Sequence, residues 1–197
     1  MFEIEDSKEW IEVAEYSPDG GILAVGSHDT NIYLYDANAD YALVGTCTKH
    51  NASLTCIDFS MDGTYIRSVC NAYELLFFMI PDGTQDPSGA SNTTGTDWAS
   101  QHCKFGWCVD GLFPKGTDGT HINGVDINED QTVICAGDDY GLVQIFRNPC
   151  RKGSMPRSYR AHSEHVVRAK FGRGGLAGYL FSVGGYDQTM LQWKKVE

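Results

Sequence analysis

Basic residues are scarce in this chain of 197 residues, which has 15 Lys and Arg against 26 Asp and Glu. The resulting formal net charge of −11 argues against a nucleic-acid-binding protein, because such proteins gain most of their affinity from clustered Lys and Arg. One basic stretch, RNPCRKGSMPRSYR at residues 147–160, is an exception, and we interpret it as a solvated loop. We therefore expect no nucleic acid among the partners.

Long apolar runs are also missing. The N-terminal sequence MFEIEDSKEW has neither the basic region nor the apolar core of a signal peptide, and no run approaches the length of a membrane span. The seven cysteines are an odd number, and several of them lie inside apolar, strand-like runs. This pattern favours buried, reduced thiols in a cytoplasmic protein that does not contact a membrane.

Motifs for metals and nucleotides are absent too. His102, Cys103 and Cys108, or His162 with His165, could be proposed as zinc ligands, but neither set has paired ligand spacing. The stretch from Asp118 to His121 lacks the spacing of a calcium loop, and there is no GxxxxGK phosphate-binding loop. We expect no metal and no cofactor.

Short alternating apolar runs separated by Asp-Gly and other turn sequences predict strands and tight hairpins. An apolar triplet with spacing i, i+3, i+5 occurs four times, and each triplet is followed by a turn and two further apolar runs. The triplets are Ile11/Ala14/Tyr16, Leu54/Ile57/Phe59, Ile122/Val125/Ile127 and Val166/Ala169/Phe171. Each unit therefore has at least three strands.

The last residues of the triplets are separated by 43, 68 and 44 residues. The two outer separations match the period of roughly 40–45 residues of WD40 propeller blades. We place the additional residues of the middle separation in an insertion at 80–116, in which 98–113 returns to the blade as an outer strand or strand pair.

We predict an all-β fold of the WD40 β-propeller type, with four visible units of four-stranded antiparallel blades. The chain is then a single propeller domain or half-propeller that is part of a larger propeller, with units at about 7–47, 50–113, 118–160 and 162–197. We expect outer strands at 41–47 and 156–161 and none in the last unit, and we expect residues 2–5 to complete another blade. A closed ring, an open arc and a dimer of two chains remain alternatives.

The fourth unit contains His162, Ser182, Asp187 and Trp193, which resemble the structural tetrad of WD40 repeats. A buried indole, hydroxyl and imidazole each need a hydrogen-bond partner, so a chain of them would fix strand to turn. The other units keep parts of this pattern, namely His50, Ser68, Asp29 and Asp139. A catalytic triad of Ser182, His162 and Asp187 is the alternative, and recurrence at blade period favours the packing role.

Loop tips are the candidate partner-binding residues, because packing inside the blades does not use them. They precede the first strand or follow the second strand of a unit: His28, Lys49, Asn51, Tyr73, His121, Tyr140, Glu164, His165 and Tyr186. Tyr and His offer apolar area with a polar end, which suits contact surfaces. The alternative, to which we give equal weight, is that these residues only cap strands and face water.

Four stretches carry a more specific resemblance, at residues 16–36, 97–123, 136–150 and 182–193. They resemble the C-terminal propeller of the echinoderm microtubule-associated-protein-like family. The resemblance implies a non-enzymatic, cytoplasmic and cytoskeleton-associated protein that binds tubulin or microtubules or recruits protein partners, and it implies that this chain is a C-terminal fragment. A purely structural role in completing a larger propeller is the second hypothesis, with self-association through unpaired blade edges, and a hydrolase on a propeller scaffold is the third.

Overall fold

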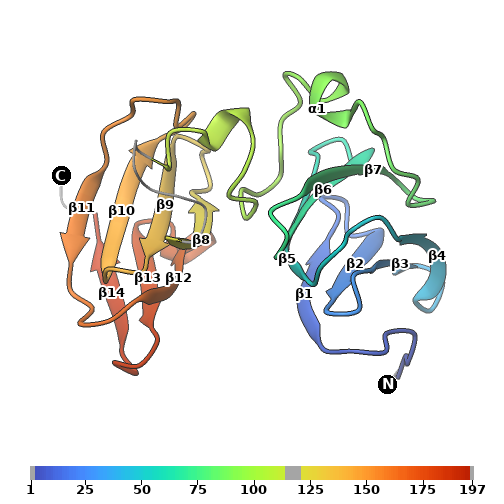
Figure 1. Cartoon of the computed structure of the whole chain (residues 1–197), viewed down its shortest axis with the longest axis horizontal. Coiled ribbons are helices and arrows are strands. Elements are labelled where there is room, and N and C mark those ends of the chain that lie inside the picture. Colours follow the sequence, from blue (N-terminus) through green and yellow to red (C-terminus); the bar gives the residue numbers. More distant parts are fainter. Residues whose placement is uncertain (1–2, 114–120, 196–197) are drawn as a thin grey trace. The chain divides into compact units, whose positions relative to one another are not determined.

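The computed structural model describes residues 3–113 and 121–195, and most of them lie in β-strands and the turns between them (Figure 1). The chain divides into two compact units, Met1–Cys103 and Lys104–Glu197, which we call unit 1 and unit 2. Each unit contains two antiparallel sheets.

Unit 1 begins with a four-stranded sheet, blade 1, in which neighbouring strands follow chain order. Its strands are β1 (Ile11–Tyr16), β2 (Ile22–Ser27), β3 (Ile32–Asp36) and β4 (Ala42–Cys47). Blade 2 has three strands, β5 (Leu54–Phe59), β6 (Tyr65–Cys70) and β7 (Leu75–Met79). Apolar residues of both sheets form one core between them, with Leu34, Ile57 and Phe59 among its buried members.

The sequences SPDG and SMDG form the first hairpin turns of these blades. In the first, the Asp19 carboxylate accepts hydrogen bonds from the Ser17 hydroxyl (2.6 Å) and from the backbone N–H of Gly21 (3.0 Å). Gly20 has φ 74°, a conformation that glycine adopts without strain. Asp62 and Gly63 repeat this arrangement in blade 2. The turn chemistry read from the sequence therefore fixes the strand ends.

Unit 2 contains a four-stranded blade 3 and a three-stranded blade 4. Blade 3 comprises β8 (Ile122–Ile127), β9 (Val133–Asp138), β10 (Leu142–Arg147) and β11 (Arg157–Arg160). Blade 4 comprises β12 (Val166–Phe171), β13 (Tyr179–Gly184) and β14 (Met190–Lys194), with a short 3-10 helix, η2 (Gly174–Leu176), between β12 and β13. Cys135 and Val143 of blade 3 pack against Val166, Ala169 and Leu180 of blade 4.

The insertion at 80–116 departs from the prediction, because its described part contains no outer strand at 98–113. It contains a one-turn helix, α1 (Gly89–Asn92), a 3-10 helix, η1 (Trp107–Val109), and an isolated bridge between Ser60 and Trp98. Single backbone hydrogen bonds, such as those from Ala99 N–H to the Phe59 carbonyl and from Met61 N–H to the Asp97 carbonyl, join it to blade 2 together with contacts of the Asp58 side chain. Cys108, Val109 and Leu112 instead join the core of blade 3.

The predicted all-β fold is confirmed, with four antiparallel sheets of three or four strands. Only blades 1 and 3 have the predicted fourth strand among the described residues. Residues 3–5 lie in no strand, and the completion of another blade by residues 2–5 stays a prediction. Asp118 and the end of the predicted insertion lie outside the described residues.

Candidate interaction surface and blade tetrads

The structure brings together the four residues of the proposed tetrad in blade 4. The indole N–H of Trp193 donates to the Ser182 hydroxyl (2.8 Å), and His162 Nε2 lies 2.8 Å from the same oxygen. The other ring nitrogen, His162 Nδ1, is 3.0 Å from an Asp187 carboxylate oxygen and 3.0 Å from the Thr189 hydroxyl. These bonds connect β13 and β14 with the loop before β12 and with the turn after β13.

Burial decides what this group can do chemically. His162 is 2 % exposed and Ser182 is fully buried. A nucleophilic serine and its base must reach a substrate, whereas the Ser182 oxygen is occupied by the indole N–H. The geometry therefore favours the packing role that the repeat pattern predicts.

Blade 2 retains half of the tetrad. The His50 ring nitrogen Nε2 lies 2.7 Å from the Ser68 hydroxyl, as the equivalent pair does in blade 4. Ala72 lies in the turn where blade 4 has its aspartate, and Phe78 replaces the tryptophan. Glu74 is the nearest carboxylate, and it lies 3.7 Å from His50 Nδ1, too far for a hydrogen bond.

Blades 1 and 3 use other polar groups at these positions. In blade 1 the Ser7 hydroxyl takes the place of the histidine and contacts Ser27 (2.7 Å) and Asp29 (3.2 Å). In blade 3 the predicted Asp139 is exposed and accepts a bond from the Asn123 side chain. Its neighbour Asp138 is buried and accepts hydrogen bonds from backbone N–H groups of the β9–β10 turn, and the tetrad role of Asp139 stays a prediction.

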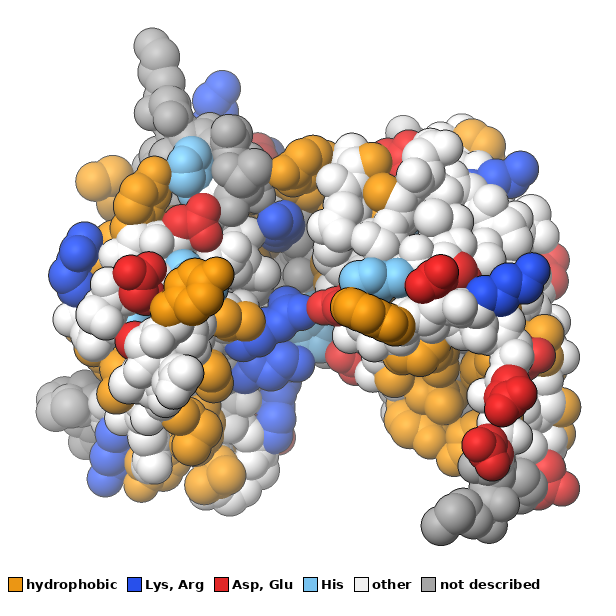
Figure 2. Space-filling view, turned by 60° about the horizontal axis from the view of Figure 1, so that its bottom comes forward, with side chains coloured by type: hydrophobic (Ala, Val, Ile, Leu, Met, Phe, Trp, Pro, Cys, Tyr) orange, Lys and Arg blue, Asp and Glu red, His pale blue; other side chains and the backbone are white. Residues whose placement is uncertain are grey.

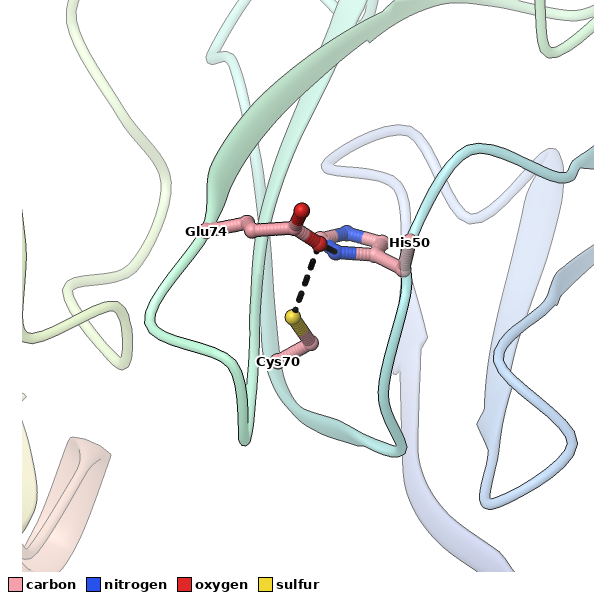
Figure 3. Close-up of side chains that lie close together, drawn as sticks. All are labelled: His50, Cys70 and Glu74. Carbon is pink, nitrogen blue, oxygen red and sulfur yellow. Dashed lines mark hydrogen bonds and ion pairs between the residues drawn. The ribbon is translucent and has the colours of Figure 1, made fainter.

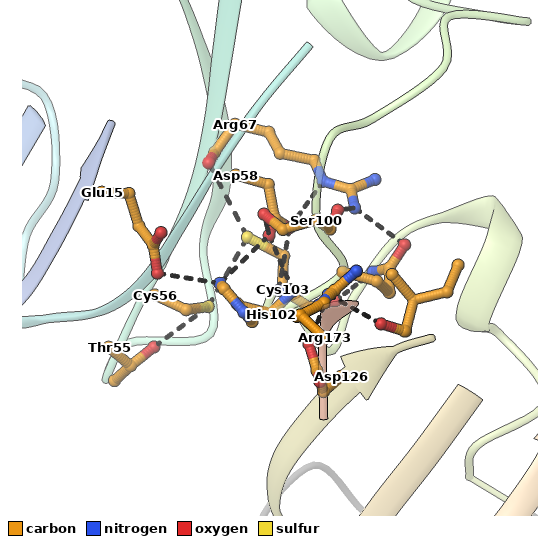
Figure 4. Close-up of polar contacts among 12 residues, drawn as sticks. Glu15, Thr55, Cys56, Asp58, Arg67, Ser100, His102, Cys103, Asp126 and Arg173 are labelled. Carbon is orange, nitrogen blue, oxygen red and sulfur yellow. Dashed lines mark hydrogen bonds and ion pairs between the residues drawn. The ribbon is translucent and has the colours of Figure 1, made fainter. Parts of the chain in front are cut away.

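A buried ion pair that the sequence analysis missed fills the other face of blade 2 (Figure 4). The Arg67 guanidinium donates to the Asp58 carboxylate (3.0 Å), and both side chains are at most 3 % exposed. Asp58 also accepts bonds from the Ser100 hydroxyl and from the backbone N–H groups of His102 and Cys103. These bonds attach residues 100–103 of the insertion to β5 and β6.

The pKa of Asp58 follows from these surroundings. Burial by itself raises the pKa of this carboxyl group, but the Arg67 guanidinium, His102 and the donated hydrogen bonds together lower it below its usual range. The face of the guanidinium lies 4.3 Å from the centre of the Trp98 ring, which adds a cation–π contact. Asp58 is thus held ionised inside unit 1.

The seven cysteines are all free and buried, as the sequence analysis expects of them. The histidines of the two sets suggested as zinc ligands have other partners: His102 lies 3.2 Å from the Glu15 carboxylate, His162 contacts Ser182 and Asp187, and His165 meets Tyr186. Burial raises the pKa of Cys47 to about 12, which makes its thiol a poor nucleophile or ligand at neutral pH.

Predicted loop tips pair as histidine and aromatic rings in three of the blades. His121 stacks on Tyr140 with ring centres 5.5 Å apart, and His165 meets Tyr186 edge-on at 5.4 Å. His28 packs against Trp10 with ring centres 5.7 Å apart, and Trp10 is not among the predicted tip residues. Trp10, Tyr140 and Tyr186 are 77 %, 56 % and 85 % exposed.

The remaining predicted tips lie at the same kind of turn. Tyr73 is 52 % exposed in the turn between β6 and β7, and Lys49 and Glu164 are exposed before the first strands of their blades. Asn51 differs, because its backbone N–H donates to the Glu74 carboxylate (3.0 Å) and its side-chain amide donates to the same group. Asn51 therefore helps to order its turn.

Charge is distributed unequally between the two units. Residues 1–103 contain 16 Asp and Glu but 3 Lys and Arg, a net charge of −13. Residues 104–197 contain 10 Asp and Glu and 12 Lys and Arg, a net charge of +2. Figure 2 shows hydrophobic side chains at the surface of the molecule among these charged groups. A single value of −11 hides this difference.

Unit 2 also has a groove of about 1030 Å³ between blades 3 and 4. Aromatic side chains line it together with basic ones, including Tyr159, Trp193, Arg147 and Arg157. An unpaired edge of β14 lies in the three-stranded blade 4. Such an edge and groove suit contact with another polypeptide better than contact with a small polar substrate.

A family model described as the second β-propeller of echinoderm microtubule-associated proteins matches residues 1–195. The chain belongs to this family. The ciliary WD repeat-containing protein ctxp80 of Euplotoides octocarinatus is 57 % identical to it over 190 residues, which is 96 % of the chain and 26 % of that relative. The echinoderm microtubule-associated protein-like 4 of Homo sapiens is 39 % identical over 98 % of the chain and 20 % of its own length.

The chain thus spans about a fifth to a quarter of these members of the family. Solved structures agree on the fold alone. The computationally designed Ika4 protein is similar with a TM-score of 0.51 and 14 % identity, over 98 % of this chain and 96 % of Ika4. A chain of the mitotic checkpoint complex is similar with a TM-score of 0.53 and 17 % identity, over 96 % of this chain and 49 % of that one. Among the described residues, no helix has the length and apolar character needed to cross a membrane.

Proposed function

We propose that this chain is a non-catalytic WD40 module that binds proteins through the exposed histidine–aromatic tips of its blades. The observation that carries the proposal is the pairing of His121 with Tyr140 and of His165 with Tyr186 at the tips of unit 2. Ring contacts hold these aromatic side chains at the surface, which lowers the entropy that a partner must remove on binding. The burial of the blade 4 tetrad, in which the Trp193 indole N–H occupies the Ser182 oxygen, supports a role without catalysis.

Microtubules are the partner that we propose for this module, in the cytoplasm and at the cytoskeleton. Relatives that match the chain are named as microtubule-associated or ciliary proteins, which supports this assignment. Unit 2 is the better candidate for contact with an acidic partner, because its charge is +2 whereas that of unit 1 is −13.

Co-sedimentation with stabilised microtubules tests this proposal. The intact chain should pellet with microtubules at low salt and keep part of that binding at moderate salt. A Tyr140→Ala/Tyr186→Ala double variant should lose at least about tenfold in affinity, as expected when two aromatic anchors of an interface are truncated. A folded chain that does not pellet at either salt concentration would overturn the assignment to microtubules.

The matched control changes exposed apolar residues at the opposite ends of the blades. Met61 lies in the turn between β5 and β6 and Leu176 lies in η2 between β12 and β13, and they are 52 % and 51 % exposed. A Met61→Ala/Leu176→Ala variant should bind as the unchanged chain does. Equal losses in both double variants would contradict a site at the tips.

A structural role in completing a larger propeller is the second candidate function. Cross-strand pairs place Tyr16, Leu23, Tyr35 and Leu43 in one row on the face of blade 1 that points away from blade 2. Tyr16 and Leu43 are 50 % and 47 % exposed, an apolar surface that another blade would cover. If this role holds, the isolated chain should self-associate in light scattering, and a Tyr16→Lys/Leu43→Glu variant should be monomeric.

A further inference from the structure

Three potential metal ligands converge at one end of blade 2 (Figure 3). His50 precedes β5, Cys70 ends β6 and Glu74 lies in the turn before β7, and their side chains point toward one another. The distance from Glu74 Oε2 is 3.3 Å to Cys70 Sγ and 3.7 Å to His50 Nδ1. The ligand atoms of all three side chains lie within 4.8 Å of one another.

The His50 ring provides an independent reason to expect a ligand here. Its side chain is completely buried, and Nδ1 has no hydrogen-bond partner among the described residues. A buried polar atom without a partner costs free energy, and such atoms are rare in folded proteins. In blade 4 the equivalent atom, His162 Nδ1, is bound by the Asp187 carboxylate at 3.0 Å.

Hydrogen bonds from neighbouring residues orient the His50 and Glu74 side chains, as is usual for metal ligands. His50 Nε2 faces the Ser68 hydroxyl at 2.7 Å, so a proton on Nε2 would leave Nδ1 with a free electron pair. Asn51 donates two hydrogen bonds to the Glu74 carboxylate, which hold it over the end of β6.

The chemistry of the donors selects the ion. One thiolate, one imidazole and one carboxylate suit Zn²⁺, whereas Mg²⁺ and Ca²⁺ prefer sites made of oxygen. Tetrahedral zinc with bonds of the usual lengths separates its ligand atoms by about 3.4–3.6 Å. The observed separations are 3.3 Å from Glu74 Oε2 to Cys70 Sγ and 3.7 Å from Glu74 Oε2 to His50 Nδ1. Small movements of the side chains would bring them to the tetrahedral values.

We propose that His50, Cys70 and Glu74 bind one Zn²⁺ ion through Nδ1, Sγ and a carboxylate oxygen. The Cys70 thiol gives its proton to solvent when the ion binds. The fourth position is open to water, because the Glu74 side chain is 27 % exposed. The ion links the loop before β5 to the β6–β7 turn, as Asp187 links the corresponding loop and turn in blade 4.

A metal titration of the purified full chain tests this proposal. The chain is stripped with a chelator, reduced and titrated with Zn²⁺ alone in competition with a chromophoric chelator, and with Co²⁺ to record absorption from a thiolate–cobalt bond. We expect one ion per chain and a thiolate–cobalt band. Cys70→Ser should abolish that band, and Glu74→Gln should weaken Zn²⁺ binding by at least about tenfold.

His28 and Glu12 provide the matched control, since they form a second histidine–carboxylate pair in unit 1 at 3.1 Å without a thiol. Glu12→Gln should bind Zn²⁺ as the unchanged chain does. Because Cys70→Ser could alter the buried end of β6, circular dichroism is recorded for each variant, and Glu74→Gln, at a partly exposed side chain, serves as the second test. No binding, or one-to-one binding that survives both Cys70→Ser and Glu74→Gln in folded protein, would overturn the site.

Discussion

His162 and His50 occupy the same position in blades 4 and 2, but their surroundings differ. Both rings contact a buried serine through Nε2, at 2.8 and 2.7 Å. His162 Nδ1 is also bound by a carboxylate, and the tryptophan indole adds a further donor to the serine. In blade 2, His50 Nδ1 has no hydrogen-bonded carboxylate, and Phe78 stands where the tryptophan would donate to the serine. The histidine–serine pair is therefore the part that the two blades share, and the groups around it vary.

Blade 2 compensates on its opposite face. The ion pair of Asp58 and Arg67 lies on the side of the sheet where the insertion packs. In blade 4 the position that corresponds to Asp58 is occupied by Lys170, which is exposed. The comparison teaches that polar fixation of a blade does not require the complete tetrad. Polar contacts on the other face of the sheet take over part of this role, although His50 Nδ1 is left without a hydrogen-bond partner among the described residues.

Loss of the Asp58 carboxylate should have the largest effect on this comparison. Asp58→Ala leaves the buried Arg67 charge without its partner and frees the backbone N–H groups of His102 and Cys103. We expect unit 1 to lose about 3–5 kcal/mol of unfolding free energy, the usual cost of breaking a buried ion pair. Denaturant unfolding followed by circular dichroism and by the combined fluorescence of the four tryptophans measures this loss.

A change at an exposed aspartate within the insertion is the control. Asp97→Ala alters a surface carboxyl group and should leave the transition of unit 1 within about 0.5 kcal/mol of the original, as is usual for surface substitutions. Equal effects of the two substitutions would show that the Asp58 network is dispensable, and blade 2 would then depend on its apolar core.

Matched serine substitutions compare the two blades directly. Ser182→Ala removes the oxygen that binds both His162 and Trp193, whereas Ser68→Ala removes a partner of His50 alone. We expect about 1–3 kcal/mol of destabilisation in blade 4 and about 1 kcal/mol in blade 2, because more buried groups lose a partner in blade 4. Calorimetry on both variants gives the two values, and a larger loss for Ser68→Ala would reverse our ranking.

The sequence predicts much of this comparison but not all of it. Apolar triplets, turn residues and the order of His162, Ser182, Asp187 and Trp193 follow a fixed spacing, so each could be read without coordinates. The Asp58 network could not, because its partners come from Arg67 and from residues 100–103, which no repeat relates to Asp58. The cluster of His50, Cys70 and Glu74 could not be predicted either, because the proximity of these side chains depends on the path of the β6–β7 turn.

Acid should act on unit 1 through Asp58. Its pKa in the folded protein is lowered, so the unfolded chain takes up a proton at higher pH than the folded chain does. The stability that the Asp58 carboxylate contributes is complete above the unfolded value of about 3.9 and is lost as the pH falls below it, through the folded value. Urea unfolding between pH 5 and pH 2.5 should show a decline that is shallower in Asp58→Asn. The same slope in both proteins would assign the decline to other carboxyl groups.

The smallest effect on stability is expected three residues from His162. His165 is in the same loop, but its ring lies at the surface against Tyr186, which is 85 % exposed. His165→Ala should change the unfolding free energy by less than about 0.5 kcal/mol, because no buried group loses a partner. The same variant should weaken microtubule pelleting if the tip binds as proposed. A stability loss similar to that of Ser182→Ala would mean that the His165–Tyr186 contact holds blade 4 together, and the tip would then belong to the scaffold.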